Sequence, residues 1–247
     1  MAKYTIEDTT LTNIANAIRT KSNTTETLKP TDMPNAINAI ETTTVVNEEG
    51  ILDAVANTTS GTSFIETDIA PGPTDEYVVE TRIAWNRINK RQLMGADFEA
   101  TYWGINASGH PEIAGTPDSN TTIEEHKFYT FKAVFLPTVR QLYVDGNLVV
   151  SIGNGNRAGG YKHQLFALRG GFNCDCAIAY QKVWINGELV AHYVAAKPAT
   201  ANSVTACFYD KVSNTYLTDI KKSDGTTGTL FFTKNNAYYR LTYLGLL

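Results

Sequence analysis

Residues 142–149 read Leu-Tyr-Val-Asp145-Gly146-Asn-Leu-Val, and residues 183–190 read Val-Trp-Ile-Asn186-Gly187-Glu-Leu-Val. In both stretches, apolar and aromatic residues flank an Asp-Gly or Asn-Gly dipeptide. Such a dipeptide tolerates positive φ at both central positions of a type I′ turn, whose twist matches that of the paired strands. The two stretches therefore predict two β-hairpins and make the bulk of the chain antiparallel β.

Further strand signals follow one another from Ser63 onward, roughly every 10 to 15 residues, as an all-β sandwich requires. The expected strands are 63–69, 77–85, 91–98, 100–106, 128–136, 139–145, 147–152, 164–169, 176–186, 188–194, 204–210 and 214–219. No convincing helix interrupts this series. The aromatic-rich tail from Leu230 to Leu244 predicts one or two more strands.

The N-terminal region has a different character. Residues 10–20 and the segment after Pro34 predict two short helices, because apolar residues recur there at helical spacing. Neither helix is long enough to be stable alone, so their apolar faces must be covered by each other, another chain or another protein. The candidate assembly residues on these faces are Leu11, Ile14, Ile18, Ile37 and Ile40.

The same change in character predicts the domain limits. Residues 1–40 are expected to form a helical attachment or oligomerisation module. Residues 41–60 are polar and β-branched around a short apolar run, which indicates a linker or a connecting strand. Residues 61–247 are expected to form one mainly β domain, an antiparallel sandwich with additional C-terminal strands.

Composition narrows the class of protein. The 247 residues are 43% hydrophobic and 11% aromatic, enough for a sizeable core, and the formal charge of −4 argues against a nucleic-acid binder.

The start shows no signal peptide and no window predicts a transmembrane helix, so we expect a protein made in a cytoplasm. Three cysteines without a signal peptide argue against disulfides, and Cys174 and Cys176 are expected to be small buried residues.

Four ordered stretches of the β region, which together span roughly residues 61–232, carry a family resemblance. They are 61–69, 142–146, 180–190 with the following 195–198, and 206–216 closing on 228–231. In this order they resemble the concanavalin A-like (laminin G-like) jelly-roll modules of phage and prophage tail proteins of Gram-positive hosts. The resemblance implies a concanavalin A-like jelly roll. Residues 11–21 and 28–40 resemble a short helical module of phage tail and fibre proteins, which implies an attachment or assembly role.

Jelly rolls of this kind include glycoside hydrolases, which place two carboxylates on one strand face. Here Asp97 and Glu99 form the only alternating acidic pair in the core strands, and Glu66 and Asp68 alternate in the first strand of the domain. Solvated faces or turns explain these acids more simply. We therefore expect no enzymatic activity, with hydrolysis as an open alternative.

The glycine-rich segment 151–160 is the first candidate recognition site. Its glycine spacing does not fit a dinucleotide fingerprint, and no helix follows it. It is either a plain rim loop or a binding loop held by a rigid scaffold. In the second case its hydrogen-bonding and aromatic side chains would contact a sugar, namely Asn154, Asn156, Arg157, Tyr161 and His163.

A second candidate lies in the expected strand 100–106. Tyr102 and Trp103 could stack on a sugar ring, with Asn106 beside them. A strand alternates faces, so the two aromatic residues cannot both point inward, and core packing is the simpler explanation for at least one. Asp118, Asn120 and Asp145 could supply calcium ligands, but nothing in the sequence fixes their geometry, so no cofactor or metal is predicted.

Together these features and the resemblance predict a virion protein, assembled in the host cytoplasm. The expected role is a tail-fibre or baseplate receptor-binding component whose lectin-like domain recognises host surface glycans. Expected partners are other phage structural proteins and further copies of the chain, in a homo-oligomer for which a trimer is one option. Neither nucleic-acid binding nor membrane insertion is expected. The alternatives are a structural decoration or spacer without ligand, and a polysaccharide-degrading tail enzyme.

Overall fold

The computed structural model describes residues 53–57, 63–97, 101–153, 160–168, 172–196 and 206–234, with the isolated positions Thr12, Ala15, Asn16 and Lys29. The chain divides into two compact units, Met1–Thr43 and Thr44–Leu247. Of the expected helix 10–20, the structure describes only the isolated positions Thr12, Ala15 and Asn16. The expected helix after Pro34 lies outside the described residues, as do the candidate assembly residues Leu11, Ile14, Ile18, Ile37 and Ile40. The helical module and the domain limits remain predictions. All the described strands belong to the second unit.

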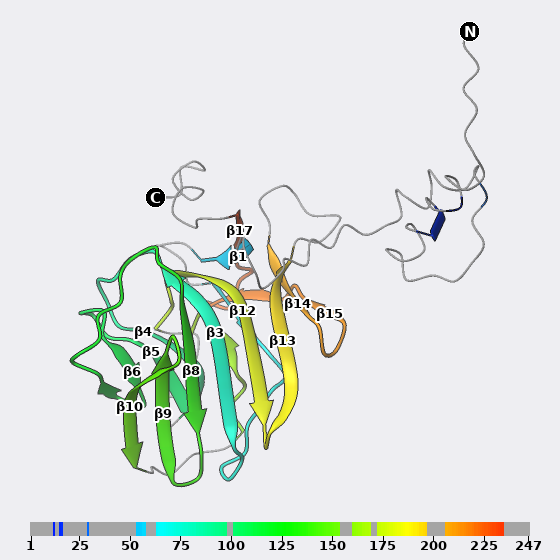
Figure 1. Ribbon diagram of the computed structural model, residues 1–247. Coiled ribbons are helices and arrows are strands. Elements are labelled where there is room, and N and C mark those ends of the chain that lie inside the picture. The colour runs from blue at the N-terminus through cyan, green and yellow to red at the C-terminus, as the bar shows by residue number, and fades with distance from the viewer. Residues whose placement is uncertain are drawn as a thin grey trace. The chain divides into compact units, whose positions relative to one another are not determined.

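The described strands of this unit form two antiparallel sheets (Figure 1). The larger has the order β10 (Asn147–Gly153), β9 (Val139–Val144), β8 (Tyr129–Phe135), β3 (Tyr77–Trp85), β12 (Cys176–Ile185), β13 (Glu188–Ala196), β14 (Cys207–Asp210), β15 (Thr215–Leu217). Beside β12, β1 (Asp53–Ala56) pairs with β17 (Phe231–Lys234). The smaller has the order β16 (Ile220–Lys222), β2 (Ser63–Glu66), β11 (Gln164–Leu165), β4 (Gln92–Asp97), β5 (Thr101–Ile105), β6 (Pro111–Ile113), β7 (Thr116–Pro117).

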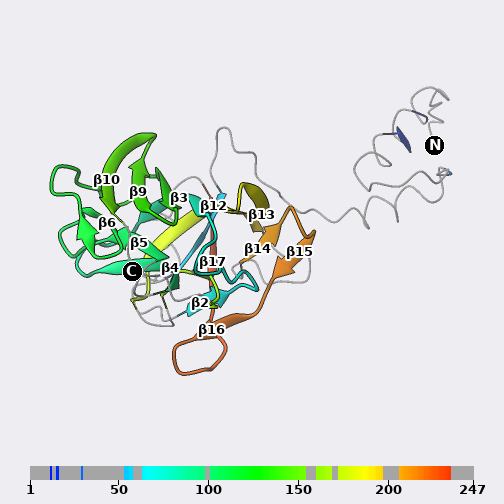
Figure 2. The ribbon, with the colours of Figure 1, turned by 90° about the horizontal axis from the view of Figure 1, so that it is seen from below.

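The two sheets stack in two layers around one apolar core, as the view from below shows (Figure 2). The alternation of side chains along each strand builds this core. In β8, for example, Phe131, Ala133 and Phe135 are fully buried while Lys132 between them is exposed. The Phe131 ring lies 4.8 Å from the Trp85 ring and 5.5 Å from the Trp103 ring. The predicted antiparallel β-sandwich is confirmed.

Both predicted hairpins are present. Asp145 and Gly146 have φ of 47° and 81°, and Asn186 and Gly187 have φ of 51° and 79°, as a type I′ turn requires. The β9–β10 turn lies beside the end of β3 that carries Arg82, whose guanidinium donates to Asp145. The β12–β13 turn lies at the other end of β3, where Ile185 pairs with Tyr77. The two turns therefore mark opposite ends of the larger sheet.

The strand limits depart from the sequence prediction where the chain changes sheets. The expected strand 214–219 is split, because β15 pairs with β14 in the larger sheet and β16 pairs with β2 in the smaller one. The expected strand 164–169 ends at Leu165, since Phe166 adopts a positive φ of 67°. The short strands β6 and β7 were not predicted, and β1, within the expected linker 41–60, pairs with β12 and β17 of the larger sheet.

The three cysteines are buried free thiols, and the burial predicted for Cys174 and Cys176 is confirmed. Burial raises the pKa of Cys207 to about 11 and the pKa of Cys176 well above its ordinary value. These thiols are therefore inert apolar residues of the core. Within the described part of the chain, no helix is long and apolar enough to cross a membrane.

Candidate functional site

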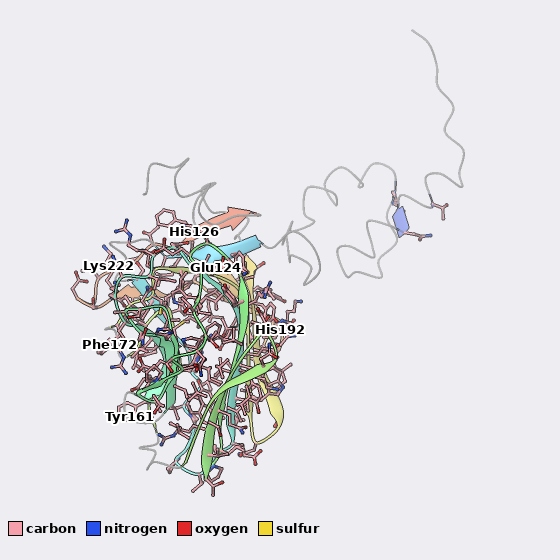
Figure 3. All side chains as sticks on the ribbon, turned by 60° about the vertical axis from the view of Figure 1, so that its left-hand side comes forward. Glu124, His126, Tyr161, Phe172, His192 and Lys222 are labelled. Atoms are coloured by element: carbon pink, nitrogen blue, oxygen red, sulfur yellow. The ribbon has the colours of Figure 1, made fainter. Side chains whose placement is uncertain are left out.

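A pocket of about 630 Å³ opens on the outer face of the smaller sheet, over β16, β2, β11 and β4. Its lining combines aromatic, carboxylate, amide, ammonium and hydroxyl groups. The lining residues are Phe64, Glu66, Ala96, Tyr161, Lys162, Gln164, Lys221, Lys222, Ser223 and Gly225. Tyr161 and Lys222 lie along one side of the sandwich together with Phe172, and His192 lies on the opposite side (Figure 3).

The floor of the pocket follows from strand alternation in β2 and β11. Ile65 and Leu165 point into the core, so their neighbours Phe64, Glu66 and Gln164 face outward. Glu66 is directly opposite Gln164 in the ladder, and the Gln164 Nε2 donates a hydrogen bond of 3.1 Å to the Glu66 Oε2. The floor therefore presents an oriented amide and carboxylate beside Phe64, which is itself 7% exposed.

Gly95 continues this floor across β4 without a side chain. It lies opposite Gln164 on one side and opposite Tyr102 on the other. A Cβ built at Gly95 would lie only 2.1 Å from the carbonyl oxygen of Thr101, and its φ is 143°. Glycine is thus required at the irregularity between β4 and β5.

One wall is formed by the segment that leads into β11. Tyr161 is 39% exposed, and Lys162 beside it places its Nζ 2.8 Å from the Asp68 Oδ1. That hydrogen bond and charge hold the pKa of Asp68 below its ordinary value. Tyr161 therefore offers an accessible ring at the rim, and Lys162 is already neutralised by a fully exposed acid.

The opposite wall is formed by β16 and its turn, which supply Lys221, Lys222 and Ser223. Lys221 is directly opposite Phe64 in the ladder. The Lys221 Nζ lies 3.8 Å from the Glu66 Oε1 and 3.5 Å from the Asp219 Oδ2. Glu66 is thus held from both sides, by the Gln164 amide and the Lys221 ammonium.

A second polar and aromatic cluster lies further along the same face. The Arg91 guanidinium donates to the Tyr102 hydroxyl at 3.1 Å and, through its Nε, to the Glu112 Oε2 at 3.0 Å. It lies over the Tyr102 ring at 5.6 Å and the Phe172 ring at 5.9 Å. The hydrogen bond to Glu112 raises the pKa of Arg91, and burial raises the pKa of Tyr102.

Strand register connects the pocket with this cluster. Glu66, Gln164, Gly95 and Tyr102 are successive cross-strand partners in β2, β11, β4 and β5. They form one row across the outer face of the smaller sheet. Phe172, 42% exposed, extends the face with a second accessible ring. The arrangement can accept an elongated ligand with flat apolar faces and several hydrogen-bonding groups.

Two predicted ligand residues are corrected by their burial. Trp103 is fully buried between the sheets beside Phe131, so it cannot stack on a sugar. His163 is also fully buried, and its ring bonds to Tyr77 and Gln181 of the larger sheet. Both side chains belong to the core, because each points from its segment of the smaller sheet toward the larger sheet.

Tyr102 and Asn106 have structural roles. As strand alternation required, Tyr102 faces away from the core while Trp103 faces into it, and Tyr102 is 5% exposed beneath Arg91. The Asn106 Oδ1 accepts hydrogen bonds from the backbone N–H groups of Ser108 and His110 and so stabilises the β5–β6 turn.

Tyr161 is the predicted ligand residue that the structure places in the pocket lining. The predicted residues Asn154, Asn156 and Arg157 lie outside the described residues.

The acids considered for catalysis and calcium binding are dispersed. Glu66 lines the pocket, Asp68 is exposed, and Glu99 lies outside the described residues. Asp118 accepts from the backbone of Asn120 and Thr121, whereas Asp145 binds Arg82 and the Thr130 backbone. In the described ranges, no group of three His, Cys, Asp or Glu side chains could hold a metal ion.

Sequence reasoning missed most of the site. Phe64, Gln164, Lys221, Lys222, Arg91, Glu112 and Phe172 were not predicted. For Phe64 the alternation around Ile65 was an available signal, because it places Phe64 and Glu66 on one face. For Lys221 and Lys222 no such signal existed, since the passage of the chain from β15 to β16 brings them to the pocket.

Comparisons with known proteins bear on the fold. No family model and no curated protein matches the chain. The structure is similar to that of a protein proposed to bind carbohydrate from Bacteroides ovatus ATCC 8483, with a TM-score of 0.51 and 12% identity over 75% of this chain and 60% of that one. The chain thus spans less than two thirds of that protein. A match to the Caenorhabditis elegans galectin LEC-6 has a TM-score of 0.30 and 12% identity, over 47% of this chain and 95% of that one. The chain shares a β-sandwich fold with the first of these structures.

Proposed function

We propose that the β domain is a carbohydrate-binding module that holds a saccharide against the outer face of its smaller sheet. The observation that carries this is the pocket over β16, β2, β11 and β4, where Tyr161 and Phe64 lie beside converging amide, carboxylate, hydroxyl and ammonium groups. Sugars need this combination, because their rings have apolar faces and their hydroxyls both donate and accept hydrogen bonds. The similarity to a protein proposed to bind carbohydrate agrees with it.

Rigidity of the floor supports the proposal. Glu66 and Gln164 are fixed by a mutual hydrogen bond on paired strands, so a ligand would find acceptor and donor already oriented. The row that continues through Gly95 to Tyr102 leads from the pocket toward Phe172, along the path that a chain of more than one sugar would take. Phe172 would then offer a second stacking surface beyond the pocket.

Binding without cleavage is part of the proposal. Hydrolysis of a glycosidic bond ordinarily uses two carboxyl groups that flank the scissile bond. Among the described residues that line the pocket, Glu66 is the single carboxylate, and its oxygens already face Gln164 and Lys221. An absence of reducing-sugar release from a bound polysaccharide would agree with this part, and release abolished by Glu66→Gln would contradict it.

The setting we propose is a phage tail appendage that contacts host surface glycans. Its support is the ordered set of resembling stretches between residues 61 and 232, and the N-terminal stretch resembling a phage attachment module. In a symmetric appendage, several weak glycan sites would act together through their effective concentration. A spacer without ligand is the competing role, and it predicts that the chain binds no glycan even at high avidity.

A glycan array probed with the full chain tests the proposal. The chain is presented on multivalent beads so that weak sites are detected. We expect binding to a subset of glycans, reduced at least tenfold by Tyr161→Ala and left unchanged by Leu148→Ala. Leu148 is a suitable control because it is 51% exposed on β10 of the larger sheet. No binding at high avidity, or equal losses in both variants, would contradict the proposal.

A further inference from the structure

The pocket lining has an unequal balance of charge. It contains three ammonium groups, on Lys162, Lys221 and Lys222, and one carboxylate, on Glu66. The whole chain carries a formal charge of −4, so this local excess of positive charge runs against the rest of the molecule. The lysines come from two segments about 60 positions apart in the sequence and meet through the pairing of β16 and β11 with β2.

Two of the three ammonium groups have carboxylate partners. Lys162 is paired with Asp68 at 2.8 Å, and Lys221 lies between Glu66 at 3.8 Å and Asp219 at 3.5 Å. Both lysines therefore already have an acidic partner.

Lys222 differs from them. Among the residues that the structure describes, none forms an ion pair with its Nζ. The charge of Lys222 acts on Asp224 of the same turn, and the Asp224 Oδ1 accepts hydrogen bonds from the backbone N–H and the hydroxyl of Thr226. Those hydrogen bonds are the main reason why the pKa of Asp224 is lowered, and the charge of Lys222 is a smaller one. Lys222 therefore keeps a positive charge that a ligand can neutralise.

We propose that the site prefers an acidic saccharide and that Lys222 binds its anionic group, a carboxylate or a phosphate. The inference rests on the proposed function and specifies its ligand class. The sugar ring would lie against the exposed part of Tyr161, and its anion would lie toward Lys222 and the Ser223 hydroxyl beside it. A charge-assisted hydrogen bond of this kind is shorter and stronger than a neutral one, so it discriminates between acidic and neutral forms of one sugar.

The same geometry predicts salt dependence. Lys222 lies in an open pocket, so added salt screens its attraction for an anion. Affinity for an acidic saccharide would fall as sodium chloride rises from 50 to 500 mM, while affinity for the neutral form of that saccharide would change little.

The experiment uses the full chain and an array of oligosaccharides in matched neutral, uronate and phosphate-bearing forms, followed by titration of the best ligand and its neutral analogue. We expect an acidic form to bind about tenfold more tightly than its neutral analogue. A preference for the uronate would identify the anion as a carboxylate, and a preference for the phosphate-bearing sugar would identify it as a phosphate. Lys222→Ala should abolish this preference, Lys222→Arg should retain it, and Lys132→Ala, an exposed lysine on β8 of the other sheet, should leave it unchanged.

The outcomes separate the two claims. Binding of neutral and acidic forms with equal affinity, or a preference that survives Lys222→Ala, would overturn the assignment of Lys222 while leaving the proposed function in place. No binding to any member of the array would overturn the proposed function and this inference with it.

Discussion

The Nε2 of His163 lies 2.5 Å from the Oε1 of Gln181, although His163 leads into β11 of the smaller sheet and Gln181 belongs to β12 of the larger one. The Gln181 Nε2 donates to the Thr81 Oγ1, so its Oε1 can only accept from the imidazole. His163 is therefore the Nε2–H tautomer, and its Nδ1 accepts from the Tyr77 hydroxyl at 2.6 Å. The ring joins the sheets directly beneath the wall that carries Tyr161.

This neutral, buried imidazole predicts a dependence of stability on pH. Burial lowers the pKa of His163 from 6.5 to about 4. Between pH 4 and pH 6.5 the imidazole is therefore protonated in the unfolded chain and neutral in the folded chain. The free energy of unfolding should therefore fall as pH drops from 6.5 toward 4, by about 3 kcal/mol for this group, and level off above 6.5. Urea unfolding measured across this pH range checks the prediction.

His163→Gln serves as its control. Glutamine does not titrate, so the difference in unfolding free energy between the two chains should shrink as pH falls. Asp175, whose pKa is raised by burial, contributes equally to both chains, so its titration does not affect this difference. A difference that stays constant from pH 7 to pH 4 would contradict the assignment.

Gly95→Ala should destabilise the domain strongly. A Cβ at this position would meet the Thr101 carbonyl at 2.1 Å, and the backbone must keep a φ of 143°. We expect a loss of more than about 2 kcal/mol, since both steric overlap and backbone strain are imposed. Gly153→Ala is the matched control, because nothing lies within 4 Å of its Cβ position and it should change stability by less than about 0.5 kcal/mol. Thermal unfolding of both variants distinguishes them.

Trp103 and Tyr161 should respond in opposite ways to replacement by alanine. Trp103→Ala removes a fully buried ring from the core and should cost about 3–5 kcal/mol. Tyr161→Ala removes a ring that is 39% exposed, so stability should change little while saccharide binding is lost. Chemical unfolding and glycan binding on the same samples test the pair, and a Tyr161→Ala chain that unfolds as easily as Trp103→Ala would contradict this placement.

Arg91→Ala should destabilise more than a surface charge change does. It would leave the Glu112 carboxylate, which is 3% exposed, and the Tyr102 hydroxyl without their shared donor. We expect a cost of about 1–3 kcal/mol, because a buried acceptor then loses its hydrogen bond. Lys127→Ala breaks the exposed pair with Glu124 and should have no measurable effect. Equal denaturation midpoints for both variants would contradict the structural role of Arg91.

The sequence was sufficient for the sandwich and insufficient for most of the site. Asp145-Gly146 and Asn186-Gly187 act locally, through φ values that their own side chains permit, so the two hairpins could be predicted from neighbouring residues alone. The pocket depends on pairings such as Glu66 with Gln164 and Phe64 with Lys221, which are separated by many positions in the chain. Hydrophobic alternation specifies which face of a strand is buried, but it does not specify which strands become neighbours.

The wrong predictions at Trp103 and His163 have the same origin. Tryptophan and histidine occur both in sugar-binding sites and in cores where their polar atoms are hydrogen-bonded. Which of the two applies depends on the residues of the facing sheet. Trp103 packs against the Phe131 ring, and His163 forms hydrogen bonds with Tyr77 and Gln181. Those partners lie on strands of the larger sheet, so no local pattern around Trp103 or His163 could reveal them.

The most direct test of the central claim is backbone amide NMR of the labelled chain during titration with the best saccharide from the array. The account predicts that shifts concentrate on β2, β11 and β16, on Tyr161 and Lys222, and along the row that ends at Tyr102. The outer face of the larger sheet, around Lys132 and Tyr143, should remain unchanged. Shifts centred on that other face, or no saturable shifts at millimolar saccharide, would contradict a carbohydrate site on the smaller sheet.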